Sequence, residues 1–519
     1  MKPVKAYLLL FVLLAPMVEA FSQKNRVSQA VEISSESPTV PLIKGLHTNP
    51  LLRVRIYVPE NAGSVSYRSI GTTLNEAAVR NIQYLNVFYT GSEALFNSKE
   101  RLDSLSSLSS NSSFAFNKEL KPGIHYLWFS ARLKEDADMD AKPEFRVRSL
   151  ESKDGKAVSV KEESKSYVKR TAIAIRKAGD DDVHTYRIPG IITTDKGTLI
   201  AVYDIRYINS SDLPGNIDVG MSRSTDGGKS WEPMKVIMDM GAPHENNGVG
   251  DPSILFDPVT KKIWVSALWS KGNRSIAGSK PGLSPDETGQ FAMVSSSDDG
   301  LSWTKPYSIT EQVKNPAWKL FFPGPGNGIA MRDGKLVFPA QYWDADHMPH
   351  STLIYSEDHG ASWKSGTGAK RNTTESQLIE TSPGELMLNM RDNRGKFRSV
   401  AITKDLGQTW VEHRSSYKAL PDPVCMASII KAPVTVKGKS GDWVFFSNVN
   451  SQRARVDMTV KASPDLGETW PDKYSLLIDE NPLYGYSALT RIDENTIGLL
   501  YEGIRDLYFI RIPVKEIIK

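Results

Sequence analysis

SPDLGETW, residues 463–470, is one of five copies of the pattern Ser/Thr-x-Asp-x-Gly-x-x-Trp in this chain. The other copies are STDGGKSW (224–231), SSDDGLSW (296–303), SEDHGASW (356–363) and TKDLGQTW (403–410). In each copy the Asp side chain can accept hydrogen bonds from nearby backbone N–H groups, the Gly can take a left-handed conformation, and the Trp can pack beneath the turn. The pattern predicts five tight turns between strands and therefore a repeat architecture.

The spacing of the five copies indicates the size of the repeating unit. They begin 72, 60, 47 and 60 residues apart, which is about the length of a four-stranded propeller blade with variable loops. Between them lie strand-like runs such as TLIAVYDI (198–205), KIWVSALW (262–269) and DWVFFSNV (442–449), with little helical periodicity. A blade without the pattern is expected where strands from both ends of the repeat region meet. We therefore predict an all-β fold with a six-bladed β-propeller over residues 168–519.

The part of the chain before the repeats has a different pattern. Residues 21–150 contain no copy of the motif but hold β-type runs, namely LLRVRIYV (51–58), NIQYLNVFYT (81–90) and IHYLWFSARL (124–133). These runs predict a small β-sandwich ahead of the propeller. Residues 151–167 belong to a charged stretch with few aromatic residues, which is typical of a linker.

Aromatic residues in the predicted sandwich suggest a carbohydrate-binding role, because aromatic rings can stack on sugar rings. The same residues are equally well explained as core, and a structural spacer is the alternative. They are Tyr84, Phe88, Tyr89, Tyr126 and Trp128.

The N-terminus reads as a secretory signal peptide over residues 1–20. Lys2 and Lys5 precede an apolar run over residues 6–15, and Val18-Glu19-Ala20 forms a small-residue cleavage site. The run is too short to span a bilayer, and no later segment is long and apolar enough to act as a transmembrane anchor. We therefore expect a protein that is secreted, or periplasmic or cell-surface, after cleavage.

Composition excludes several classes of function. The formal net charge of +4 is spread over 519 residues without a basic block, so nucleic acid is not an expected partner. Cys425 is the single cysteine, which rules out an intramolecular disulfide and favours a small buried core residue. No His, Cys or Asp cluster has the spacing of a metal site, and the acidic run at 179–182 is more simply a solvated turn.

Tyr186-Arg187-Ile188-Pro189 precedes the first turn motif by a strand–turn–strand segment. Each motif is weak alone, but YRIP followed by five of these turns, known as Asp boxes, resembles the secreted bacterial-type sialidase (neuraminidase) family. The resemblance covers about residues 170–515. It implies an enzyme that acts on sialylated glycans and needs no metal or organic cofactor.

Sialic acid carries a carboxylate on its anomeric carbon, and a planar guanidinium can bind a carboxylate with two hydrogen bonds. The family uses three arginines for this purpose. The resemblance places them at Arg187 in YRIP, Arg391 in LMLNMRDN and Arg455 in RARVDMTV. Arg187 stands within an apolar run, where a surface charge has little reason to occur.

The resemblance also implies a tyrosine nucleophile, since the substrate carboxylate would repel an Asp or Glu. A phenol has an ordinary pKa of about 10 and needs a base. The matching positions are Tyr486 in LYGYSAL and Glu375 in TESQLIE. Tyr484 remains an alternative to Tyr486 on the same face of an extended segment. Glu380 remains an alternative to Glu375.

For the general acid, the family pattern points to Asp212 in RYINSSDLPGNID, 25 residues after the first arginine. Asp204 and Asp218 are alternatives that read more naturally as structural residues. Arg206 and Asp251 resemble the family's contacts near the sugar 4-hydroxyl, or they form a salt-bridged pair at the rim. Trp269 and Phe291 are candidates for an N-acetyl pocket, with core packing as the other interpretation.

Together these residues predict an exo-sialidase that releases terminal α-linked sialic acid from glycoproteins, mucins or glycolipids with retention, through a tyrosyl-enzyme intermediate. A trans-sialidase or intramolecular trans-sialidase is the alternative within the same chemistry. A non-catalytic sialic-acid-binding propeller is the alternative outside it, but a lectin would need the arginines and not the Tyr–Glu pair.

Overall fold

The computed structural model describes residues 30–272, 274–436 and 438–518. Strands dominate this part of the chain, and its α-helices are short: α1 (Glu76–Asn81), α2 (Thr310–Val313) and α3 (Val514–Ile517). The prediction of an all-β fold is confirmed. No helix within the described ranges has the length and apolar character needed to cross a membrane. The predicted signal peptide, residues 1–20, lies outside them.

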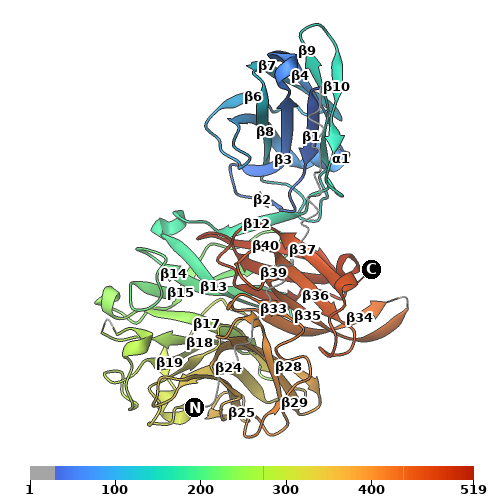
Figure 1. Cartoon of the computed structure of the whole chain (residues 1–519). Helices are drawn as coiled ribbons and strands as arrows, with labels where there is room; N and C mark the ends of the chain where they lie inside the picture. Colours follow the sequence, from blue (N-terminus) through green and yellow to red (C-terminus); the bar gives the residue numbers. More distant parts are fainter. Residues whose placement is uncertain (1–29, 273, 437, 519) are drawn as a thin grey trace, which may run out of the picture.

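Two sheets form the N-terminal region, drawn in blue and blue-green in Figure 1. Their strands are β1 (Glu32–Glu36), β3 (Asn49–Val58), β4 (Val65–Leu74), β5 (Ile82–Gly91), β6 (Arg101–Leu105), β7 (Asn111–Leu120), β8 (Gly123–Leu133), β9 (Phe145–Ser152), β10 (Ala157–Ser159) and β11 (Lys161–Glu162). One sheet has the order β11-β1-β3-β8-β5-β6 and the other β10-β9-β4-β7. Both contribute to one core, because strand alternation turns Phe114 and Phe116 inward and Ala115 outward.

The segment predicted as a linker, residues 151–167, is partly strand. It contains β10 and β11, which pair with β9 and β1 respectively. Tyr167, at its end, is buried, and its hydroxyl donates a 2.7 Å hydrogen bond to the Ser35 carbonyl. Charged side chains fit on these strands because they lie at sheet edges, where one side of each strand is exposed.

Six sheets of four or more strands form the C-terminal region, together with a two-stranded pair. The first three contain β13 (Thr185–Thr193), β14 (Leu199–Arg206), β15 (Ile217–Ser224) and β16 (Lys235–Met238); β17 (Val249–Phe256), β18 (Ile263–Trp269), β19 (Gln290–Ser296), β20 (Tyr307–Ser308) and β22 (Gly326–Asn327); and β21 (Leu320–Pro323), β23 (Ile329–Ala330), β24 (Leu336–Trp343), β25 (Pro349–Ser356), β26 (Lys364–Ser365) and β27 (Lys370–Arg371).

The remaining sheets follow in chain order. They contain β28 (Thr373–Ser382), β29 (Glu385–Asp392), β31 (Ser399–Thr403) and β32 (Val411–Glu412); the pair β30 (Lys396–Phe397) and β33 (Pro421–Asp422); β34 (Ser428–Val436), β35 (Lys439–Val449), β36 (Met458–Ser463) and β37 (Ser475–Asp479); and β2 (Leu42–Lys44), β12 (Thr171–Arg176), β38 (Ser487–Arg491), β39 (Thr496–Glu502) and β40 (Leu507–Pro513). Neighbouring sheets share buried apolar clusters.

The five Asp boxes form equivalent turns, each directly after the third strand of its sheet and before the fourth. In the third copy, Asp358 Oδ1 accepts a hydrogen bond from Ser362 N at 2.9 Å and Oδ2 accepts one from Ser362 Oγ at 2.5 Å. Gly360 has a φ of 89°, and a Cβ there would lie 2.3 Å from the Trp264 ring. Glycine is therefore required both by the left-handed backbone and by the close approach.

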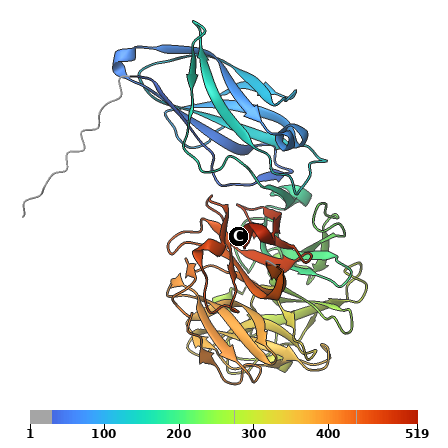
Figure 2. The same ribbon diagram turned by 90° about the vertical axis from the view of Figure 1, so that its right-hand side faces the viewer.

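The sheet formed by β2, β12 and β38–β40 joins distant parts of the chain and contains no Asp box. Its order is β2-β12-β40-β39-β38, so strands from both ends of the C-terminal region meet in it. At its edge, β2 from the N-terminal region pairs in parallel with β12. Figures 1 and 2 show from two sides that the N-terminal region lies against the C-terminal region near this sheet. Arg511 Nε also pairs with Asp140 Oδ1 across the junction at 2.8 Å.

Candidate active site

A cavity of about 520 Å³ opens in the C-terminal region, and each of its six sheets contributes a strand or a connecting loop to the wall. Of the eight residues predicted for the site, seven line this cavity: Arg187, Asp212, Asp251, Glu375, Arg391, Arg455 and Tyr486. Arg206, the eighth, is buried behind the wall and contacts Asp212. The fold therefore brings together residues that are far apart in the sequence.

Tyr486, directly before β38, forms a hydrogen-bonded group with Glu375 on β28 and Arg391 on β29. Its hydroxyl donates to Glu375 Oε1 and accepts a 2.8 Å hydrogen bond from Arg391 Nη1. Arg391 Nη1 also bonds Glu375 Oε2 at 2.6 Å. Burial and the Glu375 charge raise the pKa of Tyr486 well above its ordinary value, and Arg391 and Arg187 only partly oppose them. The phenol is therefore neutral, with a carboxylate in place to accept its proton.

Arg187, on β13, is held by a carboxylate from the far end of the chain. Glu502 on β39 is fully buried, and its Oε1 accepts hydrogen bonds from Arg187 Nε at 3.1 Å and from Ile188 N at 2.9 Å. Its Oε2 accepts a 3.0 Å hydrogen bond from Tyr486 N. One carboxylate thus fixes both the YRIP arginine and the backbone of the tyrosine.

The three predicted arginines converge on Tyr486. The guanidinium carbons of Arg187 and Arg455 lie 5.2 Å and 5.6 Å from the centre of its ring, and Arg391 bonds its hydroxyl. Arg455 is anchored by a 2.8 Å hydrogen bond from Nη1 to the Tyr484 carbonyl. The arrangement gives a strongly cationic pocket that can bind a small carboxylate with paired hydrogen bonds.

Asp212 lies in the loop between β14 and β15, and 68% of its side chain is exposed. Its Oδ1 is 2.8 Å from Arg206 Nη1 and 3.5 Å from Arg187 Nη1. Partial desolvation by the surrounding protein acts to raise the pKa of Asp212, but the charges of Arg206 and Arg187 outweigh it and hold the pKa below its ordinary value. The carboxylate is therefore charged while both arginines face it.

Asp204 is buried near the end of β14 and connects Arg206 with Asp251. Its Oδ2 accepts hydrogen bonds from Arg206 Nε at 3.1 Å and Nη2 at 2.8 Å, and its Oδ1 accepts one from Asp251 N at 2.8 Å. Asp251 has a φ of 56°. Burial and the neighbouring Asp204 and Asp212 charges raise the pKa of Asp251 well above its ordinary value, which favours its protonated form. Asp251 and Arg206 are thus joined through Asp204 rather than to each other.

The residues considered as alternatives for the base, the acid and the nucleophile do not line the cavity. Glu380 accepts hydrogen bonds from Arg332 N and Gly384 N, both at 2.9 Å, and does not line the cavity. Asp218 accepts a 3.1 Å hydrogen bond from the Tyr207 hydroxyl. Tyr484 packs its ring 4.9 Å from Arg187, outside the cavity wall.

Tyr484 and Tyr486 lie just before β38, and the Arg187 guanidinium carbon is 4.9 Å and 5.2 Å from the centres of their rings. Gly485 between them has a φ of 92°, so the segment is not a regular extended strand at that point. Trp269 and Phe291 belong to apolar clusters in the core and do not line the cavity.

Sequence reasoning missed several residues of the site. Ile276, Phe322, Gln341 and Trp343 form part of its wall, and Glu502 anchors its arginine and tyrosine. Glu502 carried one usable signal, since its charge ends the apolar run of β39. The wall residues of β24 carried none, because they continue an ordinary strand pattern.

Other reactive groups do not extend the site. Cys425 is fully buried, as predicted, and burial raises the pKa of its thiol to about 12. Among residues 30–272, 274–436 and 438–518, His, Cys, Asp and Glu side chains form no group of three that could hold a metal ion.

Comparison with known proteins places this arrangement in a family. Residues 197–500 match the family described as BNR repeat-like domain, and residues 29–156 match the N-terminal domain of BNR-repeat neuraminidase. A sialidase of Bacteroides fragilis strain YCH46 is 41% identical, over 95% of this chain and 96% of its own length. A sialidase of Micromonospora viridifaciens is 33% identical, over 63% of this chain and 52% of its own length.

A solved structure gives the same result. The Hadza microbial sialidase Hz136 superposes with a TM-score of 0.86 at 40% identity, covering 93% of this chain and all of the other. The match spans both the N-terminal sheets and the six sheets around the cavity. The chain therefore belongs to the bacterial-type sialidase family of glycoside hydrolases.

Proposed function

We propose that this sialidase is an exo-α-sialidase that removes terminal α-linked sialic acid from glycoproteins, mucins or glycolipids, with retention of configuration and through a tyrosyl-enzyme intermediate. The observation that carries the proposal is the hydrogen bond from the Tyr486 hydroxyl to Glu375 within a ring of three arginines. The curated relatives named above are sialidases, which supports the substrate class.

The substrate carboxylate explains why the three arginines and the tyrosine belong together. Arg187, Arg391 and Arg455 supply fixed guanidinium groups for a carboxylate on the anomeric carbon. That carboxylate would repel an attacking Asp or Glu, whereas a neutral phenol approaches without repulsion. As Tyr486 attacks, its proton passes to Glu375, 2.6 Å from the cation of Arg391.

Asp212 is the group proposed to protonate the leaving oxygen. Arg187 helps to keep its pKa low in the free site. When a substrate carboxylate binds Arg187, the positive charge facing Asp212 is offset, so the pKa of Asp212 should rise. Substrate binding would thereby promote the protonated form that an acid catalyst needs.

The proposed reaction has two displacements. In the first, Tyr486 Oη bonds the anomeric carbon, the bond to the leaving oxygen breaks, and that oxygen takes the Asp212 proton. In the second, Asp212 removes a proton from water, the water oxygen bonds the anomeric carbon, and Tyr486 leaves and regains its proton from Glu375. Two inversions at one carbon give net retention.

We also propose that the six C-terminal sheets are blades of a β-propeller over residues 168–519 and that the two N-terminal sheets, within residues 21–150, form a β-sandwich. Inner strands of neighbouring sheets contact one another in sequence, and the sheet of β12 and β38–β40 combines both ends of the region, as a closed propeller requires. We further propose that residues 1–20 are a signal peptide and that the protein is exported. Export would bring it to the glycans outside the cell.

The test replaces Tyr486 by Phe and follows turnover of a fluorogenic sialoside. Turnover should fall by at least about a thousandfold, since the covalent route is lost, while a sialic acid analogue should still bind the arginines. Tyr484→Phe is the matched control, because its ring also lies beside Arg187 but outside the cavity, and it should keep near-normal turnover.

Product stereochemistry gives a second measurement. In NMR spectra of the wild-type reaction, the α-anomer of free sialic acid should appear before the β-anomer. Initial release of the β-anomer would contradict the tyrosyl intermediate. Products in which sialic acid has moved to a sugar hydroxyl, or formed an internal anhydro ring, would replace hydrolysis by trans-sialidase or intramolecular trans-sialidase activity. Binding without turnover would identify a lectin.

A further inference from the structure

Another cavity of the C-terminal region, of about 420 Å³, lies toward the opposite end of the innermost strands from the active site. We call it the distal cavity. Along β13 it begins at Ile191, four residues after Arg187, and along β28 it begins at Leu378, three residues after Glu375. Each of the six C-terminal sheets contributes to its wall, so the distal cavity and the active site are built on the same strands.

A hydrogen-bonded floor separates the distal cavity from the active site. Asn327 on β22 accepts a 2.9 Å hydrogen bond from Ile191 N at Oδ1, and its Nδ2 donates one of 2.9 Å to the Leu489 carbonyl. Asn327 N donates to Gln377 Oε1 at 3.1 Å. Gln377 is buried and stands on β28 between the residues of the two cavities. A ligand in the distal cavity therefore does not reach the active site.

The wall of the distal cavity is mainly apolar. Eleven of its nineteen residues are aliphatic, aromatic or proline, so an aliphatic chain can leave water against it, which is favourable. Phe256, Ile329 and Ile430, from three different sheets, line the cavity and are only partly buried. The volume lies near the lower end of the range for small-molecule sites, about 300–1,000 Å³, which favours a short chain over a bulky ligand.

The charged side chains of the distal cavity are mostly cationic. Arg332, Lys431 and Arg491 stand against one carboxylate, that of Glu380. Glu380 is buried, and its two oxygens accept 2.9 Å hydrogen bonds from the backbone N–H groups of Arg332 and Gly384. This carboxylate therefore holds the backbone in place and does not pair with a guanidinium.

Arg491 is the cation that remains for a ligand. Its Nε donates a 3.2 Å hydrogen bond to the Asp493 carbonyl, and within the described ranges no carboxylate pairs with its guanidinium. Arg332 and Lys431 instead share Asp442 Oδ2, at 3.3 Å and 3.8 Å. Burial and the Arg332 charge lower the pKa of Lys431, and Asp442 only partly opposes them. The cavity thus carries positive charge that nearby carboxylates do not balance.

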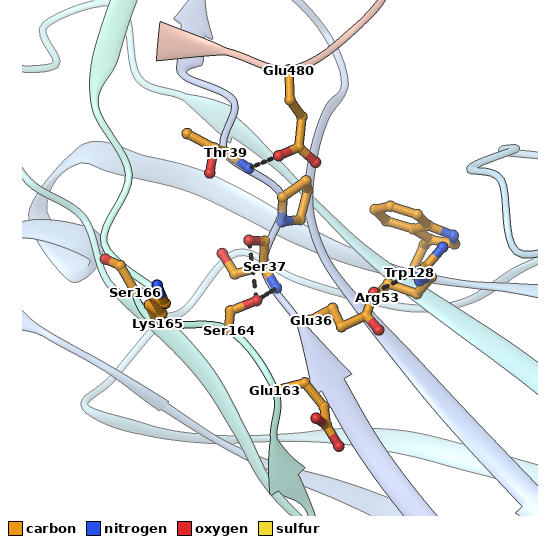
Figure 3. A pocket seen from close by; sticks show the side chains of 11 residues that line it. Glu36, Ser37, Thr39, Arg53, Trp128, Glu163, Ser164, Lys165, Ser166 and Glu480 are labelled. Atoms are coloured by element: carbon orange, nitrogen blue, oxygen red, sulfur yellow. Dashed lines mark hydrogen bonds and ion pairs between the residues drawn. The ribbon is translucent and has the colours of Figure 1, made fainter. Parts of the chain in front are cut away.

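The cavity at the junction of the N-terminal and C-terminal regions has the opposite balance of charge. It is larger, about 610 Å³, and Figure 3 shows its carboxylates and cations. The carboxylates are those of Glu36, Glu163 and Glu480, against the cations of Arg53 and Lys165. An anionic ligand is therefore favoured in the distal cavity and disfavoured at the junction.

We propose that the distal cavity binds an aliphatic carboxylate of about eight to ten carbons, such as a medium-chain fatty acid. Its chain would lie against the apolar wall, and its carboxylate would pair with Arg491. Thr193 and Thr490 also line the cavity, and their hydroxyls are 2.8 Å apart, so one of the two remains able to donate to the carboxylate. The site goes beyond the proposed hydrolysis and does not depend on it, since the two cavities share no residue.

Calorimetry with decanoate on the full chain tests the site. Titrations are made with and without a saturating sialic acid analogue, which occupies the arginines of the active site. Decanoate should bind with a stoichiometry of one in both cases. Octanoate should bind about tenfold more weakly, because two fewer methylene groups leave water. Decanol keeps the chain but lacks the charge, and it should also bind at least about tenfold more weakly than decanoate.

Three variants locate the binding. Arg491→Gln should weaken decanoate binding at least about tenfold and leave decanol binding unchanged. Lys335→Gln is the matched control, because Lys335 lies three residues after Arg332, pairs with Asp333 and does not line the cavity. It should keep the wild-type affinity for decanoate. Ala330→Trp fills the cavity from β23 and should abolish binding of both decanoate and decanol.

Melting temperatures near wild type would show that the variants are folded. Arg491 is partly exposed, so Arg491→Gln still decides the matter if Ala330→Trp destabilises the fold. Absence of saturable decanoate binding, or equal affinity in wild type and Arg491→Gln, would overturn the proposal. Displacement of decanoate by the sialic acid analogue would overturn it by placing the carboxylate in the active site. Decanol binding as tight as that of decanoate would make the cavity a site for neutral apolar ligands instead. Failure of sialoside turnover would refute the proposed function alone.

Discussion

At the scale of single residues, Glu502 couples the two halves of the proposed chemistry. It bonds Arg187, 315 residues earlier in the chain, and the backbone N–H of Tyr486. A carboxylate with no solvent contact is stable only when its oxygens are satisfied, and here each oxygen accepts at least one such bond. Displacement of the arginine would therefore also disturb the position of the tyrosine.

The planar shape of Arg187 can be tested by Arg187→Lys. Lysine keeps the charge but loses the paired geometry toward a carboxylate and the bond from Nε to Glu502. Each charge-assisted hydrogen bond contributes about 1.5–3 kcal/mol, so kcat/KM for a small sialoside should fall at least about tenfold. The comparison requires that circular dichroism and melting temperature stay near wild type, because loss of the bond to buried Glu502 can also lower kcat/KM by destabilising the fold. Full kcat/KM in this variant would show that Arg187 is not the carboxylate anchor.

Asp204 should affect catalytic activity although it does not line the cavity. Asp204→Asn keeps the shape but replaces one acceptor oxygen by an N–H donor, which cannot hold Arg206 or Asp251 N as the carboxylate does. Arg206 then no longer fixes Asp212, and we expect kcat to fall about 10- to 100-fold with a smaller change in KM.

The pH profile separates positioning from folding in that experiment. Loss of the ordered Arg206 charge should allow the pKa of Asp212 to rise, so the limb of the kcat/KM profile that reports this group should move to higher pH. Asp218→Asn is the matched control, since Asp218 is also buried, on the neighbouring strand, but bonds Tyr207. An unshifted profile with equal losses in both variants would contradict the positioning role.

The sequence located site residues where a local pattern marked them. Arg187 within YRIP and Tyr486 within GYS could be identified because their neighbours resemble a known motif, whereas Glu502 acts through a contact between distant strands that no local pattern contains. Gln341 and Trp343 alternate along β24 like residues of any buried strand. Tyr484 does not line the cavity although it is only two residues from Tyr486, a difference that a simple two-residue period does not predict.

At the scale of elements, the Asp boxes form the hydrogen-bonded turns that join the third and fourth strands of five sheets. Their shared chemistry is local, so the sequence could predict them with their boundaries. Long-range pairing is different. The three-residue strand β2 pairs with β12, more than a hundred residues later, and its few residues carry no signal for that partner. The edge strands β10 and β11 were missed because charge on an exposed edge looks like charge in a linker.

The hydrogen bonds accepted by the Asp-box carboxylate predict that the stability of the fold depends on pH. Hydrogen bonds from Ser362 lower the pKa of Asp358 from its ordinary 3.8 to about 2. A carboxyl group with a depressed folded-state pKa stabilises the fold above about pH 4, and this contribution is lost as the pH falls from about 4 to about 2. Asp358→Asn should therefore lower the melting temperature at pH 7, and the difference from wild type should shrink over that window.

A neighbouring residue supplies the control for this measurement. Glu357 stands in the same turn but pairs with exposed Lys364 at 2.8 Å, and such surface pairs contribute little. Glu357→Gln should leave the melting temperature nearly unchanged at every pH. A constant difference between wild type and Asp358→Asn from pH 7 to pH 2 would show that the carboxylate charge is not what stabilises the turn.

At the scale of the whole molecule, the N-terminal region is joined to the C-terminal region by strand pairing as well as by side chains. β2 extends the sheet of β12 and β38–β40, and Asp140 pairs with Arg511 and with Lys229. The region should therefore contribute to the stability of the molecule, although every residue predicted for catalysis follows it in the sequence.

A chain that starts at residue 166 tests this division. Loss of β2 leaves β12 as an exposed edge, so the melting temperature should fall by several degrees, while kcat/KM on a small sialoside stays within about threefold of wild type. Activity on mucin should fall further, because a second binding region raises effective concentration. Full-length Asp140→Asn, which keeps β2, should show a much smaller thermal effect. Equal losses on both substrates would assign the region a purely stabilising role.

The sheet that unites β12 with β38–β40 also sets the order in which activity can appear as the chain is made. β12 is among the first C-terminal strands to be synthesised, and it must wait for β40, over three hundred residues later, before that partner exists. Such distant pairing is slow because loop closure precedes the contact. Tyr486, the proposed nucleophile, and Glu502 lie about three hundred residues after β12, beside or within the strands that complete this sheet. A nascent chain that stops before β38 therefore lacks both residues, and we expect it to be inactive however well its earlier sheets have folded.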